Sequence, residues 1–147
     1  MREKTRSECV IIGGGIIGLA IAAKLAKQGL GVIVLEAEKQ TIQHASSHNS
    51  EVIHSGIYYK SESLKAKFCV EGNHLLYEYC HNKGIDYKRI GKLIIAHDLN
   101  EKNALNKLFL NGIKNGVDGL SVINKREIIN KEPNLNFLIL DLISQCP

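Results

Sequence analysis

The sequence predicts an α/β fold that begins with a βαβ unit, and three observations predict it. An apolar, β-branched run over residues 8–12 enters a G-x-G-x-x-G turn. An Ala-rich helical pattern follows the turn. A second apolar run, over residues 32–36, then ends in an acid. Continuous apolar runs of this length are typical of parallel strands that are covered on both faces. Because only two such strands are evident, the pattern indicates a Rossmann-like unit with an incomplete parallel sheet.

Each conspicuous position of this unit has its own physical role. Gly13 lets the strand turn sharply, Gly15 lets the backbone approach a pyrophosphate, and Gly18 lets helix and strand pack closely. The pyrophosphate would lie on free N–H groups at the helix N-terminus, where the helix dipole favours negative charge. Glu36 would accept hydrogen bonds from the adenosine ribose, and an acid there disfavours NADP. The predicted dinucleotide contacts of this unit are Gly13, Gly14, Gly15, Ile17, Gly18 and Glu36.

A secretory signal peptide is the alternative interpretation of the N-terminal region, since basic residues precede an uncharged stretch from Cys9 to Ala23. Three features count against it: Glu8 touches the apolar run, glycines interrupt the run, and a strand ending in Glu36 follows at the expected interval. The stretch is also shorter than the roughly 20 apolar residues of a membrane span. We therefore expect a cytoplasmic protein.

The composition is ordinary for a globular protein, with 44% hydrophobic and 23% charged residues and a formal net charge of +4. The basic residues are scattered and only 5% of the residues are aromatic, so nucleic-acid binding is not expected. Two groups of histidines and cysteines lack a recognised zinc spacing, and we predict no metal site. These residues are His44, His48 and His54, and His74, Cys80 and His81.

The helix between the two strands should run from about Gly15 to Gln28, with Gly29 as its C-terminal stop. Residues 37–61 show neither a helical nor a strand period and are rich in Ser, His and Asn. Long irregular connections in compact domains often have a function, so this one is a candidate for a functional loop.

The second half of the chain predicts helices around a strand. One helix should begin after Ser63 and end at Gly84, and a strand should follow over residues 85–96. The expected core stripe of this helix is Leu64, Phe68, Leu75 and Tyr79.

Asn100 should cap a third helix, and Asn124 with Glu127 resembles a capping box for a short helix that ends before Pro133. The expected core stripe of the third helix is Leu105, Leu108, Phe109 and Ile113.

The Ser- and His-rich loop over residues 46–59 follows the acid that would hold the ribose, so it should lie near the cofactor. Its small hydroxyl residues and Gly56 would permit close approach to a flavin, and His54 could supply a proton or a positive charge. The alternative is a polar surface loop whose histidines are only hydrogen-bonded.

This loop closely resembles a known family. Its letters His-Asn-Ser-Glu-Val-Ile-His-Ser-Gly-Ile-Tyr-Tyr (48–59), with residues 63–66, 69–73, 91–96 and 132–135, resemble the L-2-hydroxyglutarate oxidase or dehydrogenase branch of the D-amino-acid-oxidase-like FAD oxidoreductases. The resemblance covers roughly residues 8–136 and implies FAD as the cofactor. It also implies oxidation of a small 2-hydroxy acid to the 2-oxo acid, with hydride transfer to the flavin. Electrons would pass to oxygen or to a membrane quinone, which would place the protein at the inner face of a membrane.

The resemblance also assigns roles to loop residues. Ser47, Asn49 and Ser50 would lie along the pyrophosphate and ribityl chain. His54, as catalytic residue, and Gly56 would lie near the isoalloxazine. Residues 1–60 would form the N-terminal part of the FAD-binding domain. Residues 61–147 would be a helix-strand-helix continuation, either an insertion in the FAD domain or the start of an α+β substrate domain.

Three departures from the family pattern stand out. Glu51 replaces a usual glycine, and Ser61-Glu62 replaces a usual Pro-Gly turn. After Asn136 the resemblance ends, and family members run to about 400 residues, two domains by the usual size. We therefore expect a truncated reading frame whose residues 137–147 arise from a frameshift, too short for activity unless a second polypeptide complements it. An unpaired strand edge beside residues 8–12 should favour aggregation.

Two other functions stay open from the sequence. One is a related FAD oxidoreductase acting on glycerol 3-phosphate or an amino acid, since those branches share the fingerprint and a Ser-rich loop. The other is a nucleotide-binding fragment without turnover.

Overall fold

The structure, a computed structural model, describes residues 6–123, 125–134 and 141–145. The packing divides the chain into two compact units, one up to Val52 and one from Ile53 onward. Residues 53–60 belong with the second unit because Ile57 is buried in its core. This division at residue 52 describes packing within the chain. The expected boundary between the FAD-binding and substrate domains, after residue 60, is a different matter and stays a prediction.

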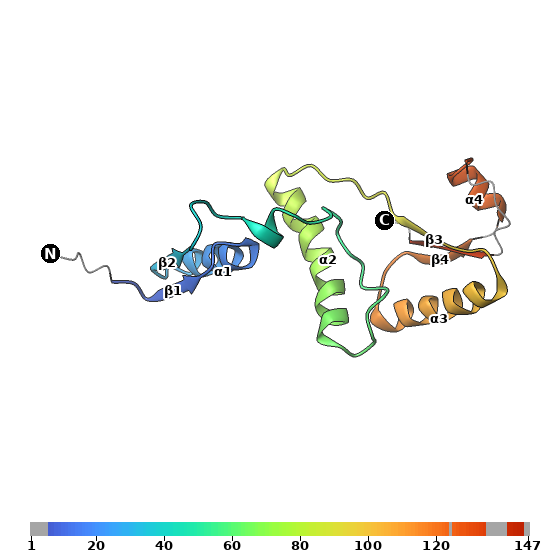
Figure 1. The fold of residues 1–147 in the computed structure, drawn as a ribbon, viewed down its shortest axis with the longest axis horizontal. Coiled ribbons are helices and arrows are strands. Elements are labelled where there is room, and N and C mark those ends of the chain that lie inside the picture. The colour runs from blue at the N-terminus through green and yellow to red at the C-terminus, as the bar shows by residue number, and fades with distance from the viewer. Residues whose placement is uncertain (1–5, 124, 135–140, 146–147) are drawn as a thin grey trace. The chain divides into compact units, whose positions relative to one another are not determined.

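The first unit is the predicted βαβ unit (Figure 1). It consists of β1 (Cys9–Ile12), α1 (Ile16–Lys27) and β2 (Val32–Leu35). The two strands are parallel, with Cys9 opposite Val32, and α1 packs against them. Among the residues that the structure describes, β1 pairs with β2 alone.

The connection after β2 is irregular, as its lack of period predicts. Within it lies one 3-10 turn, η1 (His44–Ser46). Ile42, His44 and Glu51 have positive φ angles, which cost free energy for residues that carry a Cβ. The φ of Glu51 is 53°, the left-handed region that favours glycine.

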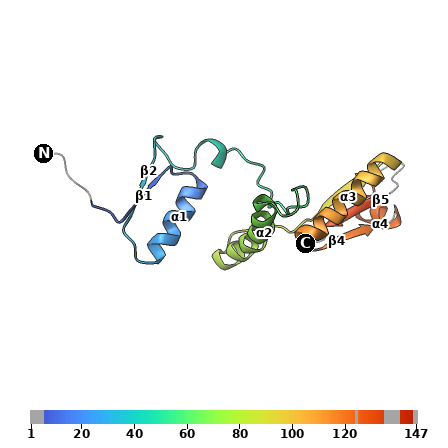
Figure 2. The same ribbon diagram turned by 90° about the horizontal axis from the view of Figure 1, so that it is seen from below.

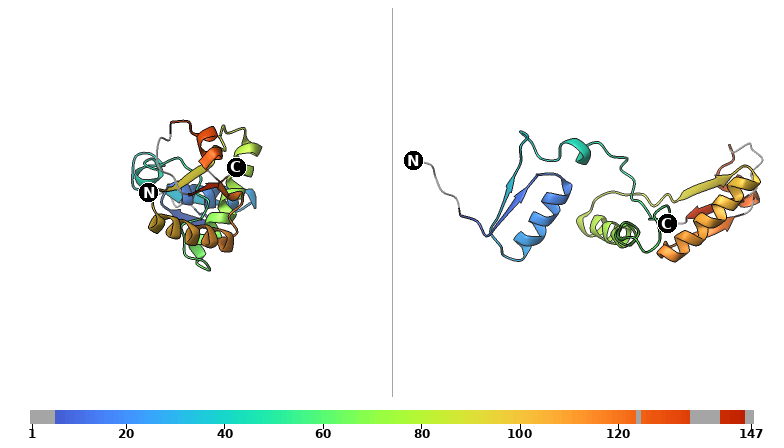
Figure 3. Two further views of the ribbon diagram at one scale, coloured as in Figure 1. Left: turned by 90° about the vertical axis from the view of Figure 1, so that its right-hand side faces the viewer. Right: turned by 60° about the horizontal axis from the view of Figure 1, so that its bottom comes forward.

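The second unit joins helices to an antiparallel sheet (Figure 2). Its order along the chain is α2 (Leu64–Lys83), β3 (Lys92–Ala96), α3 (Leu99–Asn115), β4 (Leu120–Ile123), α4 (Lys125–Lys131) and β5 (Asp141–Gln145). The last strand, β5, lies between β3 and β4 and runs antiparallel to both. Figure 3 shows α3 lying along this sheet.

Side chains from the two faces of the sheet enter two separate apolar clusters. Ala96 packs with Ile57, Leu105 and Val117 in the larger one. Ile123 packs with Ile128 of α4 in the smaller one, together with Leu93 and Ile95 of β3. Because successive side chains of a strand point to opposite faces, the strands supply both clusters.

The helix ends of α2 match the prediction, but its predicted core stripe is wrong. Ser63 caps the helix by accepting a hydrogen bond from the N–H of Ala66, and Gly84 ends it with φ 64°. The helix buries Ala66 and Cys80 instead of the stripe. Leu64, Phe68, Leu75 and Tyr79 are exposed. The helical spacing of these four residues does place them on one apolar face of α2. However, α3 packs against another face of the helix.

Three further predictions about the second unit need correction. Asp98, not Asn100, caps α3, because its carboxylate accepts the N–H of Glu101 at 2.8 Å. In the predicted stripe of α3, Leu105 is buried, but Ile113 is 53% exposed. Residues 120–123 and 141–145 form strands that were not predicted. The helix expected before Pro133 is present as α4, whereas its expected cap, Asn124, lies outside the described residues.

Candidate functional site

The glycine turn has the geometry that its sequence predicts. Gly13 adopts a φ of 103°, and its N–H donates to the carbonyl of Leu35 at 2.7 Å. A Cβ on Gly18 would overlap the carbonyl oxygen of Gly13. The turn therefore needs a glycine at position 13 for its backbone angle and one at position 18 for the contact between helix and strand.

The N-terminus of α1 is held by a residue that the sequence did not single out. Gly15 is the N-cap and has no side chain to accept a hydrogen bond. Instead Ser46, from η1, accepts the N–H of Ile16 at 3.1 Å. Its Oγ lies 3.0 Å from where a Cβ on Gly15 would be. Nothing in the spacing distinguishes Ser46 from Ser47, and only the fold brings one of them to the helix.

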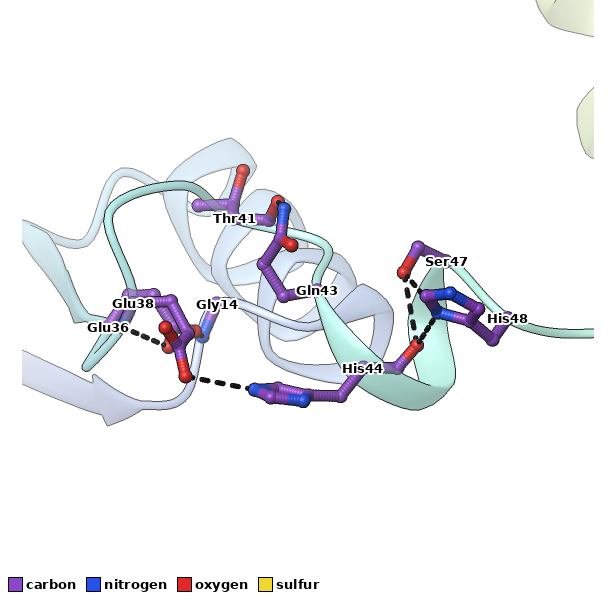
Figure 4. A network of polar contacts seen from close by, with 8 residues as sticks. All are labelled: Gly14, Glu36, Glu38, Thr41, Gln43, His44, Ser47 and His48. Atoms are coloured by element: carbon purple, nitrogen blue, oxygen red, sulfur yellow. Dashed lines mark hydrogen bonds and ion pairs between the residues drawn. The ribbon is translucent and has the colours of Figure 1, made fainter.

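Glu36 turns back toward the glycine turn (Figure 4). Its carboxylate accepts hydrogen bonds from the N–H of Glu38 at 3.0 Å and of Gly14 at 2.5 Å. These bonds, the one from Glu38 first, hold the pKa of Glu36 below its ordinary value. The group is therefore an anion at neutral pH. A carboxylate has about four acceptor positions, so two bonds leave room for ribose hydroxyls.

The rest of this loop is tied together by its own polar groups (Figure 4). The ring of His44 lies 3.0 Å from the carboxylate of Glu38. The carbonyl of His44 accepts the hydroxyl of Ser47 at 3.0 Å, and Nδ1 of His48 lies at the same distance from it. The predicted cofactor ligand Ser47 thus makes its contacts within the loop.

Asn49, another predicted cofactor ligand, is also engaged within the loop. Its amide donates to the carbonyl of Ser46 at 3.1 Å and accepts the N–H of Glu51 at 2.8 Å. This bond supports the positive φ of Glu51. Ser50 and Ile17, the other predicted contacts in the unit, are exposed.

His54 and Gly56 belong to the second unit. Gly56 is buried with a φ of 92°, and Val70 lies 3.0 Å from where its Cβ would be. The carbonyl of His54 accepts the amide of Asn73 in α2 at 3.1 Å, while its side chain is exposed. The predicted site residues thus fall into two groups, one in each unit.

These residues fit the ADP part of a dinucleotide. At the N-cap of α1, Gly15 presents backbone without a Cβ, next to the N–H groups of the first helical turn. The anionic Glu36 lies beside the same turn. The described residues hold no group of three His, Cys, Asp or Glu side chains that could bind a metal ion. No helix in the described part of the chain is long and apolar enough to cross a membrane.

Comparison with known proteins identifies the family. The family described as "FAD dependent oxidoreductase" matches residues 8–142. The match confirms the expected α/β fold and the family expected from the loop, whose members depend on FAD. It also extends beyond Asn136, where the resemblance was expected to end, and reaches the first residues of β5.

Curated relatives are similar over most of this chain. The mitochondrial L-2-hydroxyglutarate dehydrogenase of Bos taurus is 54% identical over 135 residues, which are 90% of this chain and 29% of the relative. The human protein of the same name is 54% identical over 86% of this chain and 28% of its own length. The chain thus spans less than a third of these relatives.

A solved structure has a similar fold. It is the L-α-glycerophosphate oxidase of Mycoplasma pneumoniae with FAD bound, and the TM-score is 0.83 at 29% identity. The match covers 98% of this chain and 38% of that protein.

Proposed function

Because the chain belongs to the FAD-dependent oxidoreductase family, we propose that it forms the ADP-binding end of an oxidoreductase for small 2-hydroxy acids. The proposed substrate is L-2-hydroxyglutarate, and the product is the 2-oxo acid. The observation that carries this proposal is the glycine turn with Glu36 beside it, joined to 54% identity with L-2-hydroxyglutarate dehydrogenases.

In this proposal the first unit holds the cofactor. Gly13, Gly14, Gly15 and Gly18 receive the pyrophosphate at the start of α1, and Glu36 receives the ribose hydroxyls. Ser46 joins them, because its Oγ already accepts one N–H of that helix end. Ser47, Asn49 and Ser50 lie further along the cofactor.

The second unit contributes His54 and Gly56 near the reactive ring. FAD, when bound, accepts the hydride from the carbon that bears the hydroxyl group. His54 polarises that hydroxyl or accepts its proton, a role that its exposed side chain permits. Gly56 lets the backbone of this turn lie close against α2, because a Cβ at this position would meet Val70 at 3.0 Å.

Two alternatives compete with this function. Similarity to the glycerophosphate oxidase structure supports glycerol 3-phosphate as the substrate. The identity to that oxidase is 29%, against 54% to the L-2-hydroxyglutarate dehydrogenase. The short span relative to the relatives supports a fragment that binds the nucleotide without turnover.

FAD binding is the first test. Purified chain titrated with FAD should quench flavin fluorescence and retain yellow colour after gel filtration. Gly15→Ala should weaken binding at least tenfold, because the new methyl group enters the space between the turn and Ser46. Gly72→Ala is the matched control, since a Cβ there meets nothing within 4 Å. A colourless unaltered chain would contradict the proposal.

The substrate test follows on protein that retains FAD. L-2-hydroxyglutarate, its D enantiomer, glycerol 3-phosphate and glycine are added separately without oxygen, and loss of the flavin's visible absorbance is recorded. Bleaching by the L enantiomer alone supports the proposal. Bleaching by glycerol 3-phosphate or glycine supports the related oxidoreductases, and bleaching by none supports the fragment.

We further propose a cytoplasmic location with contact to a membrane quinone pool, and a second polypeptide that complements the chain. Exposed apolar residues of β1, such as Ile12, support a polypeptide partner. The relatives above carry "mitochondrial" in their names, so cell fractionation is the direct test of location.

A further inference from the structure

The segment from His54 to Ser61 has no regular secondary structure, yet its backbone carbonyls are closely bound. Asn111 of α3 donates its amide to the carbonyls of Ile57 at 2.8 Å and Tyr59 at 2.9 Å. Asn115 donates to those of Gly56 at 3.0 Å and Tyr59 at 2.8 Å. Two side chains therefore hold three carbonyl groups of one turn, those of residues 56, 57 and 59. We name this set the amide clamp.

The geometry of the amide clamp is suited to holding one turn in one conformation. Residues four apart on a helix lie on the same face, so both amides point at one turn. Each side-chain amide has two N–H donors, and both amides use them fully. The oxygen of Asn111 accepts the hydroxyl of Ser61 at 2.9 Å, which fixes the orientation of this amide.

Packing reinforces the clamp. Ile57, whose carbonyl is one of the three in the clamp, is only 2% exposed. It meets α3 at Gly112, where an added Cβ would lie 3.0 Å from its side chain. The absence of a side chain at Gly112 lets the turn approach the helix closely enough for the amides to reach it.

The other end of the segment is held from α2. The carbonyl of His54 accepts the amide of Asn73 at 3.1 Å and lies 3.5 Å from Sγ of Cys69. The backbone is thus fixed on both sides of residue 55, whereas the side chains of His54 and Tyr58 remain exposed. The ring of Tyr58 has Nζ of Lys92 4.6 Å from its centroid. Bound carbonyls with exposed side chains suit a turn that presents groups to a ligand.

We propose that Asn111 and Asn115 are positioning residues that set where His54 and Gly56 face the flavin. This inference rests on the proposed function, which puts these two residues near the isoalloxazine. The amides do not touch the cofactor. They act through the carbonyls of residues 56, 57 and 59.

The test uses the isosteric variants Asn111→Asp and Asn115→Asp, which exchange N–H donors for a carboxylate that faces carbonyl oxygens. Asn106→Asp is the matched control on the exposed surface of α3. The backbone N–H of Tyr59 donates across the turn to the carbonyl of Gly56, so hydrogen exchange of this N–H reports whether the turn is closed. We expect exchange to become roughly tenfold faster in either clamp variant and unchanged in the control.

The second readout separates position from affinity. Both clamp variants should bind FAD with a dissociation constant within about threefold of the unaltered chain, because the ADP end is held elsewhere. The visible spectrum of the bound flavin should nevertheless change, since the turn beside the ring has moved. Lowering the pH should partly restore both spectrum and protection, because a protonated aspartate donates one hydrogen bond.

Each outcome bears on one proposal. If the turn opens and the spectrum stays the same, or if the turn does not open, the positioning role is wrong and the proposed function stands. If the unaltered chain does not bind FAD, the proposed function itself fails. If one clamp variant loses its far-UV circular dichroism, the other and Ser61→Ala, which removes the hydroxyl donor to Asn111, decide the question.

Discussion

The carboxylate of Glu36 is charged at neutral pH because two backbone N–H groups donate to it. Such bonds favour the ionised form, and the pKa of Glu36 is lowered accordingly. A group whose pKa is lowered on folding stabilises the fold above its unfolded pKa and loses that effect as the pH falls through its folded pKa. Glu36 therefore links the stability of the glycine turn to pH.

Glu36→Gln should lower the free energy of unfolding at pH 7. The neutral amide oxygen accepts hydrogen bonds more weakly than a carboxylate, and the amide NH2 group cannot accept the N–H groups of Gly14 and Glu38. The difference between variant and unaltered chain should shrink as the pH falls below the pKa of Glu36. Urea unfolding at several pH values measures it. Glu38→Gln, which alters the contact with His44 on the same loop, is the control. A difference that is constant with pH would contradict this interpretation.

Glu51 is a second residue whose local geometry has a measurable cost. Its φ of 53° is unfavourable for a residue with a Cβ but is readily adopted by glycine. Glu51→Gly should raise the free energy of unfolding by about 0.5–1 kcal/mol in thermal or urea unfolding. Glu62→Gly should gain less, because Glu62 shares a positive φ but also pairs with Lys114 at 2.9 Å. Equal increases in the free energy of unfolding would contradict a stabilising role for the Glu62–Lys114 pair and leave backbone strain as the common cause.

At the scale of elements, β1, the glycine turn and α1 meet in one close backbone contact, between Gly13 and Gly18. The helix approaches the end of the strand so closely that position 18 has no room for a methyl group. The same approach brings the N-terminus of α1 to the loop that carries Glu36 and Ser46. The packing requirement and the binding requirement therefore act on the same turn.

Gly18→Ala should destabilise the chain by about 2 kcal/mol, because the new methyl group overlaps a backbone oxygen that cannot rotate away. Gly72→Ala in α2 should instead stabilise by up to about 1 kcal/mol, since alanine favours helix and nothing lies in its way. Thermal unfolding of both variants gives the comparison. Destabilisation by both would mean that helix propensity and packing are not separable here.

At the scale of the molecule, each unit leaves apolar surface exposed. Ile12 of β1 is 89% exposed, and β1 has one unpaired edge among the residues that the structure describes. An exposed apolar strand edge is a template for association with another chain. The exposed stripe of α2 adds a second apolar surface, in the other unit.

The isolated chain should therefore self-associate as its concentration rises, which sedimentation velocity measures. Ile12→Lys should reduce this association, because a charged residue on a strand disfavours pairing at the edge. Ile90→Lys alters an equally exposed isoleucine outside any strand, and its effect should be smaller. A chain that stays monomeric at all concentrations would contradict the prediction.

The parts of the fold that depend on neighbouring residues could be predicted from the sequence. The glycine turn, the cap of α2 at Ser63 and its stop at Gly84 follow from local backbone requirements, and the structure has all three. Predictions that needed a partner from elsewhere in the chain were weaker. The predicted stripe of α2 is apolar and has helical spacing, but nothing in its sequence shows that α3 packs against another face of the helix.

By itself, the sequence determined the βαβ unit, the position of its acid and the irregular loop after it, because these depend on backbone geometry within a few residues. Only the tertiary structure decided that Ser46 reaches the helix end, that β5 separates β3 from β4, and that two asparagines hold the turn after His54. The amide contacts join residues 52 to 59 positions apart. These hydrogen bonds form only after the core has brought the two segments together, so they cannot be predicted from a local sequence pattern.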